Sequence, residues 1–261
     1  MFDKEFVSKK VQSLLSQARN RGLFQLPVEP RTMASLCSVL SVEDRPMVPE
    51  GVLAPVRGGF RVFLQDNFVS EPGSRVRRRF TLAHELAHTF FYSLEGDLPK
   101  PIKGTPRGMR LERLCQLGAG EILVPEGILR GKMQSEQIAS ADELLYLAAT
   151  FDVSLEVIFR RIQELHLVAE NEFAAVLVDR INGKDVIQAS CYGSLLLCNL
   201  PKPRRGTELD VWVEPLKVLQ QDLGTEVPVA TKTAEIQTRK VHRSRRSYIF
   251  ELKFSPLRGA Q

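Results

Sequence analysis

The chain has 261 residues, of which 43% are hydrophobic and 26% charged, and its formal net charge is +5. This composition excludes a disordered chain, and no run approaches the roughly 20 apolar residues that a membrane-spanning helix requires. The N-terminal segment has charges at helical spacing and lacks the apolar block of a signal peptide, so we expect a cytoplasmic protein.

The four cysteines, Cys37, Cys115, Cys191 and Cys198, form no C-x-x-C pair and have apolar or mixed neighbours. This pattern indicates reduced, mostly buried thiols and argues against a zinc site built on sulfur. The positive charge gathers at the C-terminus, where residues 201–261 hold twelve Lys and Arg against seven Asp and Glu. We interpret this segment as a solvated basic face, with attraction to nucleic acid or an acidic partner as the alternative.

Residues 3–20 have apolar side chains at helical intervals, which predicts an amphipathic helix. Residues 45–55 contain several prolines, which predicts a loop. In residues 58–67, Phe60, Val62 and Leu64 alternate with Arg61 and Gln65, as in a half-buried strand. Our hypothesis is that this strand is a sheet edge that binds an extended substrate, the alternative being an ordinary structural strand.

The next segment, residues 80–92, reads FTLAHELAHTFFY and contains His84, Glu85 and His88 in the spacing H-E-x-x-H. Residues four apart share one face of a helix, so both imidazoles are able to reach one metal ion with Glu85 beside them. The alternative is a pair of histidines in an apolar core. The chain has only four His, and two of them fall here at ligand spacing, which favours the metal site.

Four arginines, Arg75, Arg77, Arg78 and Arg79, precede this motif. We expect them to form the exposed first turns of the same helix, capped by Ser74, and we keep recognition of an acidic substrate as the alternative. Residues 93–108 are rich in Gly and Pro, and we expect a flexible loop near the site.

A second helix is predicted from Met109 to the stop at Pro125, and it holds two candidates for a third ligand, Glu112 and Glu121. Nine residues at about 100° each put these two side chains half a turn out of phase, so a straight helix cannot aim both at one metal. The small side chains of Cys115 and Ala119 continue the Glu112 face and would allow close packing, which favours Glu112 without excluding Glu121.

FTLAHELAH followed by ERLCQLGAGEILVP resembles the ImmA/IrrE family of zinc-dependent peptidases, and its IrrE branch in particular. The resemblance covers about residues 55–127. It implies Zn²⁺, with Mn²⁺ as an activating substitute, bound by His84, His88 and Glu112. Gln116 stands where the family often has Asn, a difference that leaves these ligands unchanged.

In such a site Glu85 would act as the general base on a metal-activated water and then protonate the leaving amine. The donor that stabilises the oxyanion stays unassigned among Tyr92, His166, His242 and an arginine. Tyr92 follows His88 by four residues, but a tyrosine at the edge of the core is equally consistent with the pattern.

Residues 135–165 show two helical patterns around a turn at Phe151-Asp152-Val153, with Ser154 as the cap of the second helix, which is the outline of a helix-turn-helix. Apolar side chains dominate the second helix, so we expect it to pack against the peptidase domain, with DNA reading as the alternative.

Four later runs, residues 173–180, 185–192, 210–214 and 248–254, have strand-like composition and predict a small sheet domain. The family resemblance implies a GAF-like sensor at this position. Trp212 and Tyr248 are candidates to line a small-molecule pocket, with a place in the core as the alternative.

The sequence therefore predicts an α+β fold: a zincin-like peptidase domain (1–130), a helix-turn-helix-like region (131–168) and a C-terminal GAF-like mixed sheet domain (169–261). The resemblance implies a zinc endopeptidase that cleaves a helix-turn-helix repressor of the XRE type and so induces a DNA-damage or stress response. The alternative function is a DNA-binding regulator that uses the peptidase fold as a scaffold and binds through the middle helices and the basic tail.

Overall fold

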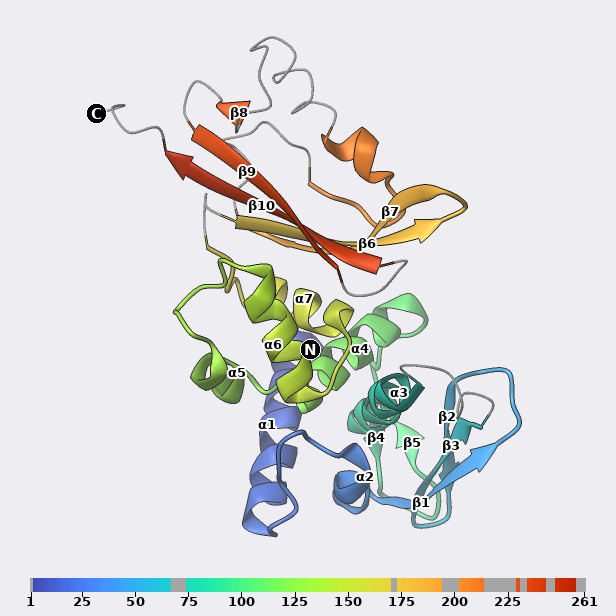
Figure 1. Cartoon of the computed structure of the whole chain (residues 1–261). Coiled ribbons are helices and arrows are strands. Elements are labelled where there is room, and N and C mark those ends of the chain that lie inside the picture. The colour runs from blue at the N-terminus through green and yellow to red at the C-terminus, as the bar shows by residue number, and fades with distance from the viewer. Residues whose placement is uncertain are drawn as a thin grey trace. The chain divides into compact units, whose positions relative to one another are not determined.

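The computed structural model describes residues 2–66, 74–169, 173–193, 202–213, 229–230, 234–242 and 247–256. It divides into two compact units: unit 1 comprises residues 1–129 and 149–154, and unit 2 comprises residues 130–148 and 155–261. Helices and sheets are mixed (Figure 1), as the predicted α+β class requires. None of the described helices is long and apolar enough to cross a bilayer. The division into three domains stays a prediction.

Unit 1 contains, in chain order, α1 (Lys4–Asn20), α2 (Pro30–Met33), a 3₁₀ helix (Ala34–Cys37), β1 (Val39–Arg45), β2 (Gly51–Val56), β3 (Gly59–Gln65), α3 (Ser74–His88), a 3₁₀ helix (Thr89–Phe91), β4 (Tyr92–Ser93), β5 (Lys100–Pro101) and α4 (Met109–Leu123). Helix α1 confirms the amphipathic prediction, because Asp3 caps it and its apolar face is buried. The helix α5 (Glu126–Lys132) begins in unit 1 and ends in unit 2.

The three-stranded sheet of unit 1 has the order β1-β3-β2, with β1 parallel and β2 antiparallel to β3. Two predictions are therefore wrong. Residues 45–55 are not simply a loop, because they contain the end of β1 and most of β2. The strand β3 is not a sheet edge, because both of its sides are paired, and it cannot receive an added strand.

Unit 2 contains α6 (Ala141–Phe151) up to residue 148, then α7 (Leu155–Glu164), β6 (Phe173–Ile181), β7 (Lys184–Tyr192), β8 (Val229–Ala230), β9 (Ala234–His242) and β10 (Ser247–Pro256). The helices α6 and α7 and the turn between them agree with the predicted helix-turn-helix outline, and Ser154 directly precedes α7. The strands form an antiparallel sheet of order β7-β6-β10-β9-β8.

Two local predictions in unit 2 need correction. Residues 209–213 are helical rather than extended, because Leu209, Trp212 and Val213 have the i, i+3, i+4 spacing that buries one helix face against the sheet. The strand β9 was missed, because the side chains of its residues 237–240 are exposed and show no apolar alternation.

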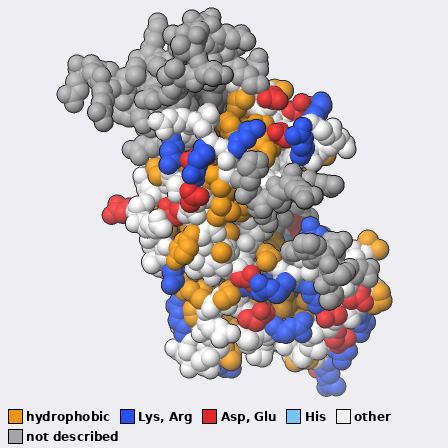
Figure 2. Space-filling model, in the orientation of Figure 1, with side chains coloured by type: hydrophobic (Ala, Val, Ile, Leu, Met, Phe, Trp, Pro, Cys, Tyr) orange, Lys and Arg blue, Asp and Glu red, His pale blue; other side chains and the backbone are white. Residues whose placement is uncertain are grey.

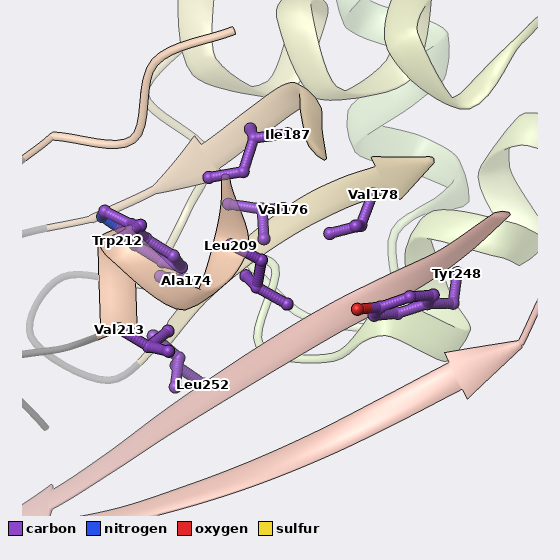
Figure 3. Close-up of a cluster of buried hydrophobic side chains, with 9 residues drawn as sticks. All are labelled: Ala174, Val176, Val178, Ile187, Leu209, Trp212, Val213, Tyr248 and Leu252. Atoms are coloured by element: carbon purple, nitrogen blue, oxygen red, sulfur yellow. The ribbon is translucent and has the colours of Figure 1, made fainter. Parts of the chain in front are cut away.

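Trp212 and Tyr248 lie in a packed apolar cluster between the 209–213 helix and the strands β6 and β10 (Figure 3). Only 2% of Trp212 and 7% of Tyr248 is exposed, and the Tyr248 hydroxyl donates to Asp185 Oδ2 at 2.6 Å. Both residues therefore belong to the core. Cys37, Cys115 and Cys191 are free and buried as expected, whereas Cys198 lies outside the described residues.

Candidate metal centre

The H-E-x-x-H motif lies in the last two turns of α3, which ends at His88. The apolar face of α3, with Leu82, Ala83, Leu86 and Ala87, is buried and holds the helix in the core of unit 1. His84 and His88 are partly buried, and their rings meet edge to face with centroids 4.8 Å apart. Both imidazoles thus point to the same side of the helix, as the four-residue spacing predicts.

The helix α4 brings Glu112 to these histidines because it packs very closely against α3. A Cβ atom placed on Gly118 would lie 2.9 Å from the Cβ of Ala87, so only glycine permits the observed approach. Cys115 and Ala119 are fully buried in the same region, whereas a Cβ atom placed on Gly120 would have no neighbouring atom within 4 Å. The small residues that favoured Glu112 in the sequence do lie in this part of the core.

The ligand atoms of His84, His88 and Glu112 all lie within 4.8 Å of one another. The Nε2 atoms of the two histidines are 3.1 Å apart, and Glu112 Oε2 lies 3.1 Å from His84 Nε2 and 3.7 Å from His88 Nε2. Ligands at the usual zinc distances and tetrahedral angles are about 3.3 to 3.4 Å apart. Two imidazoles and one carboxylate at these separations therefore fit a zinc ion with a position left open.

Glu121 has a different neighbour. Its side chain is buried and accepts a hydrogen bond of 2.7 Å from the Ser8 hydroxyl of α1. The two glutamates of α4 thus face different helices, in agreement with their opposite phase.

Burial keeps both histidines in the neutral form that metal binding requires. It lowers the pKa of His84, against the attraction of Glu112. Burial and the adjacent charge of His84 together lower the pKa of His88 to about 4, again opposed by Glu112. Unprotonated ring nitrogens are therefore available at neutral pH.

Glu85 is 7% exposed and points toward β2. Burial is the larger cause, and repulsion from Glu112 the smaller, of a rise in the pKa of Glu85 to about 7. A hydrogen bond from the Leu53 backbone amide opposes that rise in pKa. A bound cation would act in the same direction as the amide, because it favours the carboxylate form. A carboxyl group tuned in this way is suited to proton transfer near neutral pH.

These side chains line a cleft of about 610 Å³ within unit 1. The remaining lining residues come from β2 and the residue before it, from α3 and β4, and from the first half of α4, namely Glu50, Gly51, Val52, Leu53, Phe80, Thr81, Tyr92, Leu111 and Gln116. The strand beside the motif is therefore β2, and it is an edge strand among the described residues. The strand β2 was not predicted from the sequence, although Pro55 is consistent with an edge position.

Of the candidates for oxyanion stabilisation, Tyr92 lines the cleft. It does so from β4, because α3 ends at His88 and Tyr92 no longer belongs to the helix. His166 lies in unit 2 and the side chain of His242 lies outside the described residues. The segment 93–108 contains the end of β4 and the whole of β5, and these two short strands pair antiparallel to each other. None of the residues 93–108 is among the cleft-lining residues described.

The arginines before the motif do not form a uniformly exposed turn. Arg79 is buried, donates to Asp152 Oδ2 at 2.7 Å and also bonds the Val28 carbonyl. Arg75 pairs with Asp152 as well, and Arg78 pairs with Asp44. The prediction of exposure is wrong for Arg79, whose role is to fix α3 to the turn after α6.

Comparison with known families matches residues 68–163 to the peptidase M78 model, described as the IrrE N-terminal-like domain. No curated protein matches the chain. A solved Mycobacterium tuberculosis transcriptional regulator shares 14% identity with a TM-score of 0.47, covering 96% of this chain and 78% of that chain. The family match spans both the histidine motif and Glu112, so residues 68–163 of this chain are similar in sequence to the IrrE N-terminal-like domain.

Proposed function

We propose that the protein is a zinc-dependent endopeptidase of the zincin type, with His84, His88 and Glu112 as metal ligands and Glu85 as the catalytic residue. The observation that carries this proposal is the convergence of three ligand atoms from two helices within 4.8 Å, beside a buried carboxylate. Zn²⁺ is the expected metal, with Mn²⁺ as an activating substitute. The match to a peptidase family supports the reaction class.

A zinc ion held at this centre supplies a Lewis acid for a peptide carbonyl and lowers the pKa of a water molecule. Glu85 would take the proton of the attacking water at a carboxylate oxygen and pass it to the leaving amine. His84 and His88 remain neutral, so their ring nitrogens would be free to hold the metal ion. Tyr92 is the described cleft residue with a phenol that is able to stabilise the oxyanion.

The substrate that we propose is a helix-turn-helix repressor of the XRE type, cleaved in the cytoplasm to induce a DNA-damage or stress response. The open cleft beside an edge strand suits an extended segment of another protein better than an enclosed small molecule. The unit 2 sheet, as a GAF-like sensor, would select the partner or receive the signal.

The test uses the purified full chain loaded with Zn²⁺ and small helix-turn-helix proteins encoded in reading frames next to its own. We expect one zinc per chain and a new N-terminus in one such protein. Glu85→Gln should lower the cleavage rate by a factor of about 10² to 10⁴ while zinc is retained. Full cleavage by Glu85→Gln, or a wild-type protein that binds no zinc, would refute the proposal.

The alternative, a DNA-binding regulator, has less support within unit 2. The second helix of the motif, α7, buries Leu155, Ile158 and Phe159, and the side chain of Gln163 accepts a hydrogen bond from the backbone of Tyr192 on β7. Arg160 lies 3.3 Å from Glu156. On the face in Figure 2, basic and acidic side chains of the described residues are interspersed. Duplex binding that weakens steeply with salt and is lost in Arg160→Ala would favour the regulator instead.

A further inference from the structure

The outer edge of β2 can be worked out from its pairing with β3. The Glu50 carbonyl accepts a hydrogen bond of 3.0 Å from the Gln65 amide, so the backbone of residue 50 points toward β3. Backbone groups alternate direction along a strand, and residues 52, 54 and 56 therefore also point toward β3. Gly51, Leu53 and Pro55 point outward, to the side that no described strand pairs with.

Two of these three outward positions offer no free amide donor. The Leu53 amide donates to the Glu85 carboxylate, and Pro55 has no N–H. Glu85 is buried, and a carboxylate in such surroundings needs fixed donors to hold one orientation. The strand β2 therefore contacts the proposed general base directly.

Gly51 determines how closely β2 approaches α3. A Cβ atom at this position would lie 2.6 Å from Thr81 Cγ2 and 2.8 Å from Glu85 Oε1, which are distances that real Cβ atoms do not tolerate. The backbone of Gly51 is not in the left-handed region, so its conformation does not require glycine. The requirement is for space beside the Glu85 carboxylate.

We propose that Gly51 and the Leu53 amide are positioning residues for Glu85, which they hold in one orientation beside the His84, His88 and Glu112 cluster. The catalytic consequence rests on the function proposed above, whereas the contact itself does not. A side chain at position 51 would push the carboxylate away from its amide donor and from the attacking water. Displacements of about 1 Å in such a group lower rates about 100-fold.

The kinetic test compares Gly51→Ala with Gly120→Ala, whose added methyl group meets no atom within 4 Å. In the zinc-loaded protein, we expect Gly51→Ala to lower kcat about 100-fold with KM within about threefold and one zinc retained. Gly120→Ala should match the wild type. A third comparison uses the double variant Gly51→Ala/Thr81→Ser, with the single variant Thr81→Ser as its reference. The double variant lacks the Thr81 methyl group, so only the close contact between the new Cβ and Glu85 remains. A low kcat in this double variant supports the proposal, and recovery to the Thr81→Ser rate overturns it.

Amide hydrogen exchange at Leu53 tests the contact without metal or substrate. Glu85→Ala removes the acceptor and should speed exchange at Leu53 about tenfold or more, whereas Glu85→Gln keeps a carbonyl oxygen and should stay within about threefold of the wild type. The Ala54 amide, which points toward β3, is the internal control. Unchanged exchange at Leu53 in Glu85→Ala overturns the positioning role. If the wild type cleaves nothing but Leu53 responds as expected, the proposed function fails and the contact stands.

Discussion

At the scale of single residues, the two glutamates of α4 show how position decides chemistry. Glu112, in the first turn, lies 3.1 Å from His84 Nε2, and half of its side chain is exposed to the cleft. Glu121, two and a half turns later, is buried and bonded to Ser8. The same residue type therefore serves metal binding at one position and helix packing at the other.

We predict that Glu112→Gln lowers zinc affinity at least about 100-fold, because it removes the only charged ligand of the proposed site. Glu121→Gln is the matched control. It should keep one zinc per chain and lower the free energy of unfolding by about 1 kcal/mol, through a weaker bond to Ser8. Metal content measured after dialysis, together with urea unfolding, checks both expectations. Normal zinc content in Glu112→Gln would exclude Glu112 as a ligand.

At the scale of helices and strands, the geometry of the site depends on close approaches that small residues permit. Gly118 of α4 faces Ala87 of α3 and Val7 of α1, and Gly51 of β2 faces Glu85. The salt bridge of Arg79 with Asp152 holds the N-terminal half of α3. Helix α3 is therefore held along its length, and this leaves little freedom in the position of the histidines.

Gly118→Ala should destabilise unit 1 by about 1 to 3 kcal/mol, because its methyl group would lie 2.9 Å from the Ala87 Cβ and the two helices would have to separate. Gly120→Ala, on the same helix with open space around it, should instead stabilise by up to about 1 kcal/mol through helix propensity. Chemical unfolding of the two variants measures the contrast. Equal stability of both would show that the α3–α4 contact is looser than described.

Removal of Arg79 should leave Asp152 without its buried partner. We expect Arg79→Met to lower the free energy of unfolding by about 3 to 5 kcal/mol, the usual consequence of breaking a buried pair. Arg77→Met, which removes a more exposed arginine 3.9 Å from Glu50, should change it by less than about 1 kcal/mol. The comparison is made by urea unfolding, and similar losses in both variants would contradict the structural role of Arg79.

At the scale of the whole molecule, the chain divides into two compact units. The proposed metal site belongs wholly to unit 1, whereas Trp212, the only tryptophan, lies in the core of unit 2. Its fluorescence therefore reports on unit 2. Binding of a metal to the native state stabilises the unit that holds it, by about 2.7 kcal/mol when free metal is 100 times Kd.

We predict that chelation of the metal lowers the melting temperature seen by circular dichroism for unit 1 but leaves the transition seen by Trp212 fluorescence unchanged. Adding back zinc should restore the first transition. If both signals move together, the two units unfold as one cooperative structure. If neither moves, no metal is bound at the His84, His88 and Glu112 cluster.

The sequence by itself determined the features that depend on spacing within one helix: the shared face of His84 and His88, and the opposite phases of Glu112 and Glu121. It also indicated α1, α6, α7 and three strands of the unit 2 sheet, because apolar periodicity is a local signal. Only the tertiary structure decided that β2 rather than β3 is the strand beside the site, that Gly51 lies against Glu85, and that Arg79 is buried. Strand order and close packing depend on contacts between residues far apart in the chain. The local sequence pattern does not specify which of these distant residues will be in contact.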